Sequence, residues 1–207
     1  MNSVNERLAA LRSQMKQNGV QACIVPSADP HMSEYLPAYW AARSYFSGFT
    51  GSAGTLVVTE TQSGLWTDGR YFIQAAHQLE GSEITLYRMA VKGVPTYTEF
   101  LAEELNEGET VGFDGKMLSA AAVEEMREKF AGKKLKIKAV DLIQDIWTDR
   151  PEMPASKVFV HDVKYAGYTC QEKLEQVRAE LKKQHEDELR AGAEQLDKLR
   201  KAAETAA

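Results

Sequence analysis

The sequence has 207 residues, of which 43% are hydrophobic and 27% are charged, a composition typical of a globular protein. Its net charge of −5 argues against a general nucleic-acid-binding protein, which usually carries a basic patch or an alkaline isoelectric point. No apolar run approaches the roughly 18 residues that span a bilayer, and the N-terminus lacks the basic and apolar regions of a signal peptide. We therefore expect a cytoplasmic protein that binds neither nucleic acid nor membrane.

Apolar spacing along the chain predicts alternating helices and strands. Residues 4–18 have helical spacing and end at Asn18-Gly19, a common C-terminal signal. Further helices are expected at residues 71–78, 96–105 and 119–130, with shorter helical pieces within 32–46 and at 142–147. Strands are expected at residues 20–26, 55–59, 64–67, 83–88, 110–113 and 135–140. This alternation predicts an α/β fold, with a mixed sheet flanked by helices.

The prolines at positions 151 and 154 mark a stiff exit from the first domain. We expect a domain at residues 1–155, a strand-like linker at 156–169 and a long helix at 170–207. The two cysteines, Cys23 in an apolar run and Cys170 at the start of the long helix, do not form the framework of a disulfide-rich protein.

An internal similarity links the two ends of the chain. Residues 5–17 and residues 172–184 both form amphipathic helical patterns with the same apolar phase and an arginine just after an apolar position. A glycine and a strand follow the first helix, whereas no strand follows the second. The chain therefore begins what looks like a second copy of the same unit and does not build it.

The last residues, 185–207, are almost all strong helix formers. Leu189, Leu196 and Ala203 are seven apart, as are Gly192 and Leu199, which gives a weak helical seam. One interpretation is a solvated extension of the preceding helix. The other is an engineered or substituted helical extension that mediates self-association, and the sequence leaves both open.

Four motifs follow one another at characteristic spacing: residues 27–35 (SADPHMSEY), 43–55 (RSYFSGFTGSAGT), 65–75 (LWTDGRYFIQA) and 145–151 (DIWTDRP) with Tyr165-Ala166-Gly167 and Glu172-Lys173-Leu174 behind it. Their order resembles the creatinase-like N-terminal domain of the long-form Xaa-Pro aminopeptidases, over roughly residues 3–184. The second and third motifs are the most specific.

This resemblance carries several implications. Such enzymes remove an N-terminal residue that precedes proline, with a pita-bread catalytic domain that holds two divalent metals, usually manganese. The N-terminal domain has a ribonuclease-H-like fold without metal ligands, helps to close the active-site mouth and takes part in subunit contacts. In the long form, a second and similar domain follows it.

The sequence departs from the full family pattern in its metal ligands. A two-metal site needs several carboxylates and a histidine around one cavity. The four histidines, at positions 31, 77, 161 and 185, are scattered and lack ligand-pair spacing. We therefore expect no cofactor and no catalytic residue in this chain, and a partner in the form of a missing catalytic domain.

Seven residues are candidates for the substrate mouth or an interface. Asp29, His31 and Glu34 follow the first strand, where α/β proteins place binding groups, although Asp29 can also serve only to cap its loop. The others are listed together: Arg43, Asp68, Arg70 and Tyr71. Arg70 can either project into a cleft or form a buried pair with Asp68 that locks the turn, and Arg43 can belong to the same cluster.

These observations predict a regulatory or structural domain of a metallopeptidase that is inactive alone, shapes the active-site mouth and supports a homo-oligomer. The alternative is an engineered scaffold whose C-terminal helix programs self-association.

Overall fold

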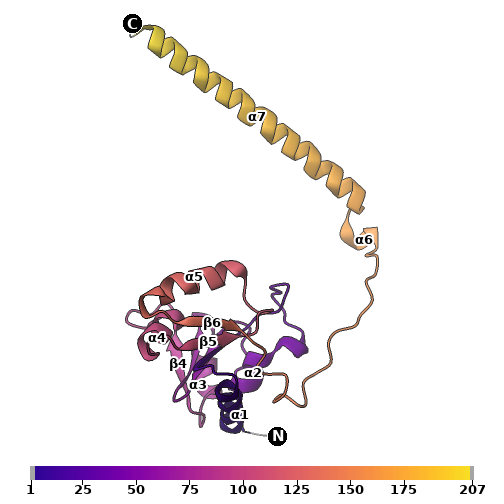
Figure 1. Ribbon diagram of the computed structural model, residues 1–207. Coiled ribbons are helices and arrows are strands. Elements are labelled where there is room, and N and C mark those ends of the chain that lie inside the picture. Colours follow the sequence, from indigo (N-terminus) through magenta and orange to yellow (C-terminus); the bar gives the residue numbers. More distant parts are fainter. Residues whose placement is uncertain (1–2, 206–207) are drawn as a thin grey trace. The chain divides into compact units, whose positions relative to one another are not determined.

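The computed structural model describes residues 3–205 (Figure 1). The chain divides into two units, residues 1–155 and residues 156–207. Within the described range, no helix is both long enough and apolar enough to cross a membrane.

The first unit contains six strands and five α-helices among its described residues. The strands are β1 (Ala22–Pro26), β2 (Thr55–Thr59), β3 (Ser63–Thr67), β4 (Ile84–Arg88), β5 (Thr110–Phe113) and β6 (Lys136–Ala139). The α-helices are α1 (Val4–Gln17), α2 (Ala42–Ser47), α3 (Phe72–Gln78), α4 (Tyr97–Glu104) and α5 (Ala120–Phe130), with short 3₁₀ turns at η1 (Ala38–Trp40), η2 (Gly69–Tyr71) and η3 (Ala131–Lys133).

All six strands form one mixed sheet in the order β4-β3-β2-β1-β5-β6. Only β2 runs against its neighbours: it pairs antiparallel with β1 and β3, whereas the other three pairings are parallel. The predicted mixed α/β sheet is confirmed. Because β2 alone is reversed, its first residue lies at the same edge as the carboxyl ends of the other five strands.

Helices cover both faces of this sheet (Figure 1). Successive residues of a strand point to opposite faces, so each strand feeds two cores. Cys23 and Val25 of β1 pack with α1, α2 and α3, whereas Ala22 and Ile24 pack with α4 and α5. The helical spacing predicted for residues 4–18 is confirmed, because its apolar side chains Leu8, Leu11 and Met15 are at most 1% exposed.

Side-chain caps begin the helices where the sequence offers them. Ser3 and Glu6 form a capping box at α1, and Thr96 and Glu99 form another at α4. At α5, Ser119 is the cap and accepts from the backbone N–H of Ala122 at 3.2 Å. Each cap satisfies a donor that the first helical turn would leave free.

The predicted helical piece at 142–147 is wrong, because this segment consists of turns without an α-helix. Its apolar residues are nonetheless buried: Leu142, Ile143 and Trp147 are at most 6% exposed. Trp147 stacks on Tyr45 with ring centroids 4.5 Å apart. The apolar spacing therefore reflects burial and not a helix. The segment packs on the face of the sheet that α1 covers.

The strand-like linker is also corrected. Residues 157–162 have no strand partner in the described chain, and residues Val163–Ala166 form a short helix, α6. The short helical piece expected within 32–46 is confirmed as η1 and the start of α2, after an irregular segment at 32–37. An apolar run forms a strand only where a neighbouring strand accepts its backbone hydrogen bonds.

The second unit is dominated by α7 (Cys170–Thr205), a helix of 36 residues. Its predicted extent, 170–207, ends in two residues outside the described range. The side chain of Ala203, the last position of the expected seam, also lies outside the residues described in atomic detail.

The two cysteines differ in environment. Cys23 is 3% exposed within the sheet, and this burial raises the pKa of its thiol to about 12. Cys170 is exposed at the start of α7. A thiol with a raised pKa is a poor nucleophile at neutral pH, so Cys23 serves as a small core residue.

Gly64 on β3 provides a test of how tightly this core is packed. A Cβ at Gly64 would lie 2.6 Å from the Trp66 ring and 2.7 Å from the Tyr87 ring. These two rings stack at 4.1 Å, so neither can yield without disturbing the other. We predict that Gly64→Ala lowers the free energy of unfolding by about 1–3 kcal/mol, measured by urea denaturation.

The matched control is Gly132→Ala, because a Cβ at that exposed position meets nothing within 4 Å. We expect a change within about 1 kcal/mol there. Equal effects of the two substitutions would show that the Trp66–Tyr87 stack does not constrain β3.

Candidate functional site

The loops and short helices at the carboxyl edge of the sheet carry all seven candidate residues. The loop after β1 contains Asp29, His31 and Glu34, α2 contains Arg43, and the turn after β3 contains Asp68, Arg70 and Tyr71. The glycine-rich loop at 48–54 enters β2 at the same edge. Because β2 is the reversed strand, its entry loop meets the exits of β1 and β3, which brings three sequence motifs together.

The loop after β1 is held by Asp29. Its carboxylate accepts from the backbone N–H of His31 at 2.8 Å and of Ser33 at 3.0 Å. These bonds, first of all the one from Ser33, lower the pKa of Asp29. Asp29 is 3% exposed, whereas His31 and Glu34 are exposed. The geometry therefore gives Asp29 a loop-capping role and leaves Glu34 open to a ligand.

Arg43 is a buried candidate charge, at 4% exposure. Its Nε donates to the hydroxyl of Ser27 at 2.9 Å, and its two terminal nitrogens donate to the carbonyls of Phe49 and Gly51. Its guanidinium lies 4.7 Å from the centre of the Phe49 ring. Burial lowers the pKa of Arg43 to about 10. The side chain of Arg43 therefore binds the glycine-rich loop and is not part of the Asp68–Arg70 pair.

The glycines of this loop permit close packing. Gly48 has φ of +73° and ends α2 in the left-handed conformation. A Cβ at Gly51 would lie 2.3 Å from the Phe49 ring and 2.8 Å from the Tyr71 ring. Gly51 is thus the position at which the loop passes between two aromatic side chains.

Asp68 and Arg70 form a two-bond pair at the end of β3. Arg70 donates from Nε at 2.9 Å and from a terminal nitrogen at 2.8 Å, and its backbone N–H donates to the same carboxylate at 3.0 Å. These bonds lower the pKa of Asp68 and raise the pKa of Arg70. The negative charge of Glu34 also raises the pKa of Arg70. The Arg70 side chain is 69% exposed, so the pair is a surface feature and not a buried lock.

Tyr71 connects this turn to the glycine-rich loop. Its hydroxyl lies 2.7 Å from the hydroxyl of Ser52, and this hydrogen bond lowers the pKa of Tyr71. Its ring meets the Phe49 ring edge to face, with centroids 5.7 Å apart. Tyr71 thus fixes the distance between the exit of β3 and the entry of β2.

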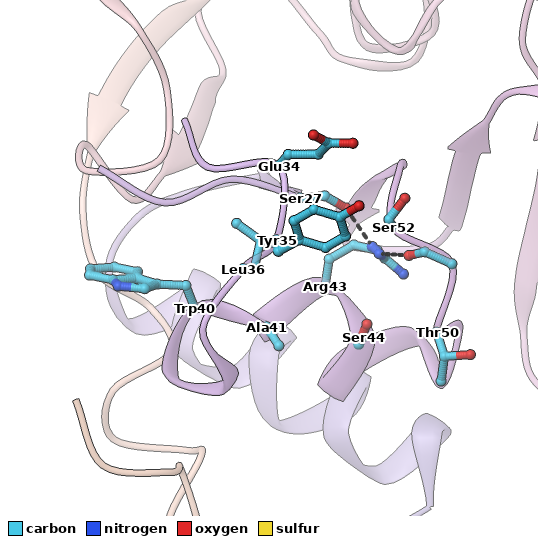
Figure 2. Close-up of a pocket in the computed structure, with 11 residues that line it drawn as sticks. Ser27, Glu34, Tyr35, Leu36, Trp40, Ala41, Arg43, Ser44, Thr50 and Ser52 are labelled. Carbon is cyan, nitrogen blue, oxygen red and sulfur yellow. Dashed lines mark hydrogen bonds between the residues drawn. The ribbon is translucent and has the colours of Figure 1, made fainter. Parts of the chain in front are cut away.

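Two adjoining hollows open at this edge and share Ser27, Glu34, Leu36 and Ser52. The first, of about 220 Å³, is lined by Arg43 together with Tyr35 and Trp40. Figure 2 shows Arg43 in the midst of its lining residues, with its hydrogen bond to Ser27 dashed. The second, of about 450 Å³, is lined by Arg70, Met32 and the start of α5. We call the two together the edge groove.

Glu34, Arg43 and Arg70 line the edge groove. Tyr71 lies next to it, whereas Asp29 does not line it. Ser27 and Ser52 were missed as lining residues, although both lie within the motifs that the sequence singled out. The signal that could have found them is their position beside Pro26 and Gly51, where small polar residues border a strand end and a tight turn.

Within residues 3–205, no group of three or more histidine, cysteine, aspartate or glutamate side chains is arranged to hold a metal ion.

Comparison with known families identifies the fold. The family model for the creatinase/prolidase N-terminal domain matches residues 7–150, and a second model of the same description matches residues 149–195. The chain belongs to the creatinase/prolidase N-terminal domain family. The second match continues to residue 195, past Gln184, near which we expected the family pattern to end.

Curated relatives with high similarity are Xaa-Pro aminopeptidases. The chain is 44% identical over 184 residues to aminopeptidase P2 of Arabidopsis thaliana, covering 86% of this chain and 26% of that protein. It is 46% identical over 187 residues to a probable Xaa-Pro aminopeptidase P of Talaromyces stipitatus, covering 88% of this chain and 28% of the relative. The chain therefore spans little more than a quarter of the length of these relatives.

Among solved structures, X-prolyl aminopeptidase from Caenorhabditis elegans matches with a TM-score of 0.78 and 33% identity, over 89% of this chain and 32% of that one. That protein is described as a cytosolic enzyme with a di-nuclear active site. The N-terminal domain of PepQ from Mycobacterium tuberculosis shares the fold, with a TM-score of 0.51 and 24% identity over 69% of this chain and 98% of that domain.

Arg43 provides the test of the site's scaffold. We predict that Arg43→Met lowers the free energy of unfolding by about 2–4 kcal/mol, because it leaves two carbonyls and one hydroxyl of the edge groove without their donors. Arg43→Lys should recover only part of this loss, since an ammonium cannot reproduce the planar fork. Chemical denaturation measures both.

Arg70→Ala is the matched control, because it removes an arginine of the same groove whose pair is exposed. We expect its unfolding midpoint to match that of the unaltered chain. A midpoint for Arg43→Met as high as that of Arg70→Ala would show that the buried bonds do not hold the groove.

Proposed function

We propose that this chain acts as the non-catalytic N-terminal domain of a Xaa-Pro aminopeptidase, with the edge groove facing the mouth of the active site. The observation that carries the proposal is the position of Glu34 and Arg70. Two exposed, opposite charges border one groove at the strand ends, on loops fixed by buried hydrogen bonds. Family membership and the short span relative to whole aminopeptidases support a role within a longer enzyme.

The groove's chemistry suits the backbone of a short peptide. Arg70 is oriented by Asp68 and presents remaining N–H donors to solvent, where a guanidinium can hold a carbonyl or a carboxylate. Glu34 offers a carboxylate nearby, which suits an amino terminus or a peptide N–H. A rigid pair of opposite charges at the mouth would select short peptides by their ends.

The reaction would require a catalytic domain outside this chain, with two divalent metals, which we propose to be manganese, and with the cytosol as its compartment. The description of the Caenorhabditis elegans neighbour as a cytosolic enzyme with a di-nuclear active site supports the number of metals and the compartment. The role of this chain's own residues would be to limit access and to orient peptide ends.

The first test concerns catalysis. We predict that the purified chain does not cleave an Xaa-Pro-Xaa tripeptide in the presence of manganese. In a whole aminopeptidase that carries this sequence as its N-terminal domain, Arg70→Ala should lower kcat/KM for tripeptides at least tenfold. Arg70→Lys should retain an intermediate value, because it keeps the charge and loses the fork.

His77→Ala on α3 is a suitable control, because its exposed side chain lies outside the groove lining. Turnover by the isolated chain that disappears with Arg70→Ala would contradict the non-catalytic role. Unchanged kinetics of Arg70→Ala in the whole enzyme would contradict the proposal that the edge groove faces the active-site mouth.

Self-association is a second candidate role, which the exposed apolar side chains of α7 favour. We predict that light scattering gives more chains per particle for residues 1–207 than for a version without residues 185–207. An equal number of chains per particle in the two versions would contradict an assembly role of the tail.

A further inference from the structure

The first hollow of the edge groove is a small cavity with mostly apolar walls and a buried charge in its lining. It holds about 220 Å³, and its walls include Tyr35, Leu36 and Trp40. All of its lining residues fall within residues 27–52, inside the segment that one family model matches as a whole. The hollow is therefore built entirely by the first unit, from the loop after β1, α2 and the glycine-rich loop.

The buried charge in this lining is the guanidinium of Arg43. Its three hydrogen bonds go to neutral oxygens, and within residues 3–205 no carboxylate forms an ion pair with it. Arg12 and Arg70 differ, because each of them pairs with a carboxylate. The dipoles around Arg43 stabilise its charge without neutralising it. A buried net charge favours an anion in the adjoining space, since opposite charges attract more strongly away from bulk water.

The hollow also keeps hydrogen-bond donors for such an anion. A guanidinium has five N–H groups, and the three bonds of Arg43 use three of them. Another donor comes from Ser52, which lines the hollow and shares a hydrogen bond of 2.7 Å with the hydroxyl of Tyr71. Whichever of the two hydroxyls donates in that bond, the other keeps its hydrogen for a further acceptor.

Glu34 is the acidic residue in the lining, and its charge acts on a different arginine. It raises the pKa of Arg70, whereas burial, opposed by Tyr71, lowers the pKa of Arg43. Because Glu34 also borders the second hollow and is exposed, its carboxylate can be stabilised by solvent and by Arg70. An anion at Arg43 therefore gains more from the guanidinium than it loses to Glu34.

We propose that the first hollow binds a free carboxylate at Arg43 and, against its apolar walls, the apolar side chain beside that carboxylate. An α-carboxylate next to an apolar side chain is the chemistry of the last residue of a peptide, or of a free amino acid. The volume of about 220 Å³ lies below the roughly 300 Å³ at which pockets for drug-sized ligands begin, so the hollow suits a single residue.

This inference deepens the proposed role at the active-site mouth, and it rests on that role only for the source of the peptide. With the carboxylate at Arg43, the exposed fork of Arg70 is left for a backbone carbonyl, and Glu34 for a peptide N–H or an amino terminus. The groove would then favour peptides that end within it, because a longer peptide has no carboxylate at this position.

Titration of the 207-residue chain with matched peptides tests the carboxylate. We expect Gly-Pro-Leu to shift the NMR signal of the Arg43 Nε–H group with a dissociation constant of about 1 mM or lower. The C-terminal amide of the same peptide should bind at least tenfold more weakly, because it lacks the charge that the buried guanidinium attracts. Gly-Pro-Gly should bind about fivefold more weakly, since it has no apolar side chain to bury.

Free leucine distinguishes the two sources of this chemistry. A dissociation constant for leucine within about threefold of that for Gly-Pro-Leu would assign the site to an amino acid. A larger constant would assign it to the end of a peptide, whose remaining backbone adds contacts. Either result supports a carboxylate site, provided that the acid binds more tightly than the amide.

Two substitutions of Ser44 test the position without altering Arg43. Ser44 is a half-buried residue of the lining whose side chain has no hydrogen bond among the described residues. Ser44→Leu fills the hollow and should weaken the binding of Gly-Pro-Leu at least tenfold, whereas Ser44→Ala leaves the space open and should change it by less than about threefold. Chemical denaturation verifies that both variants are folded, and the comparison of acid with amide needs no variant.

Equal affinity for Gly-Pro-Leu and its amide would overturn the carboxylate site, as would the absence of a saturable shift up to about 10 mM peptide. Equal affinity in the two Ser44 variants would overturn the assignment to the first hollow. None of these outcomes affects the proposed role at the active-site mouth, which the kinetics of Arg70→Ala in the whole enzyme test.

Discussion

The buried guanidinium of Arg43 joins three oxygens that belong to separate parts of the chain: the Ser27 hydroxyl after β1 and the Phe49 and Gly51 carbonyls before β2. All three are neutral, so the charge of Arg43 is balanced by dipoles. Burial lowers its pKa only to about 10, and the group therefore stays protonated at neutral pH. A planar fork with several donors suits this task, because it can bind diverging acceptors at once.

The rest of the carboxyl edge depends on this arrangement. With the Phe49 and Gly51 carbonyls fixed, the loop lies where the Tyr71 ring meets Phe49 and its hydroxyl meets Ser52. Tyr71 directly follows Arg70, so the buried bonds of the second motif set the position of the exposed pair in the third. The two motifs that distinguish the sequence are therefore one structural unit, in which a rigid interior supports the exposed charges of Glu34 and Arg70.

Periodicity predicted most of the sheet and its helices, because burial on one or two faces determines the spacing of apolar residues in α1, β1 and α5. It failed at 142–147, where Trp147 packs against Tyr45 from a turn, and at 157–162, where a short apolar run has no neighbouring strand. The seven candidate residues do gather at one edge of the sheet. Their individual roles depend on contacts distant in sequence, such as that of Arg43 with Ser27, which no local pattern encodes.

The two helices of the internal similarity, α1 and α7, differ in the burial of their apolar faces. Leu8, Leu11 and Met15 of α1 correspond in phase to Leu174, Val177 and Leu181 of α7, and Arg12 corresponds to Arg178. In the first unit the three apolar side chains are at most 1% exposed and Arg12 pairs with Glu83 at 2.6 Å. The same face of α7 is more than half exposed. Because residues 149–195 match a family model of the same description as the first unit, the apolar phase of α7 follows the pattern that α1 buries against its sheet.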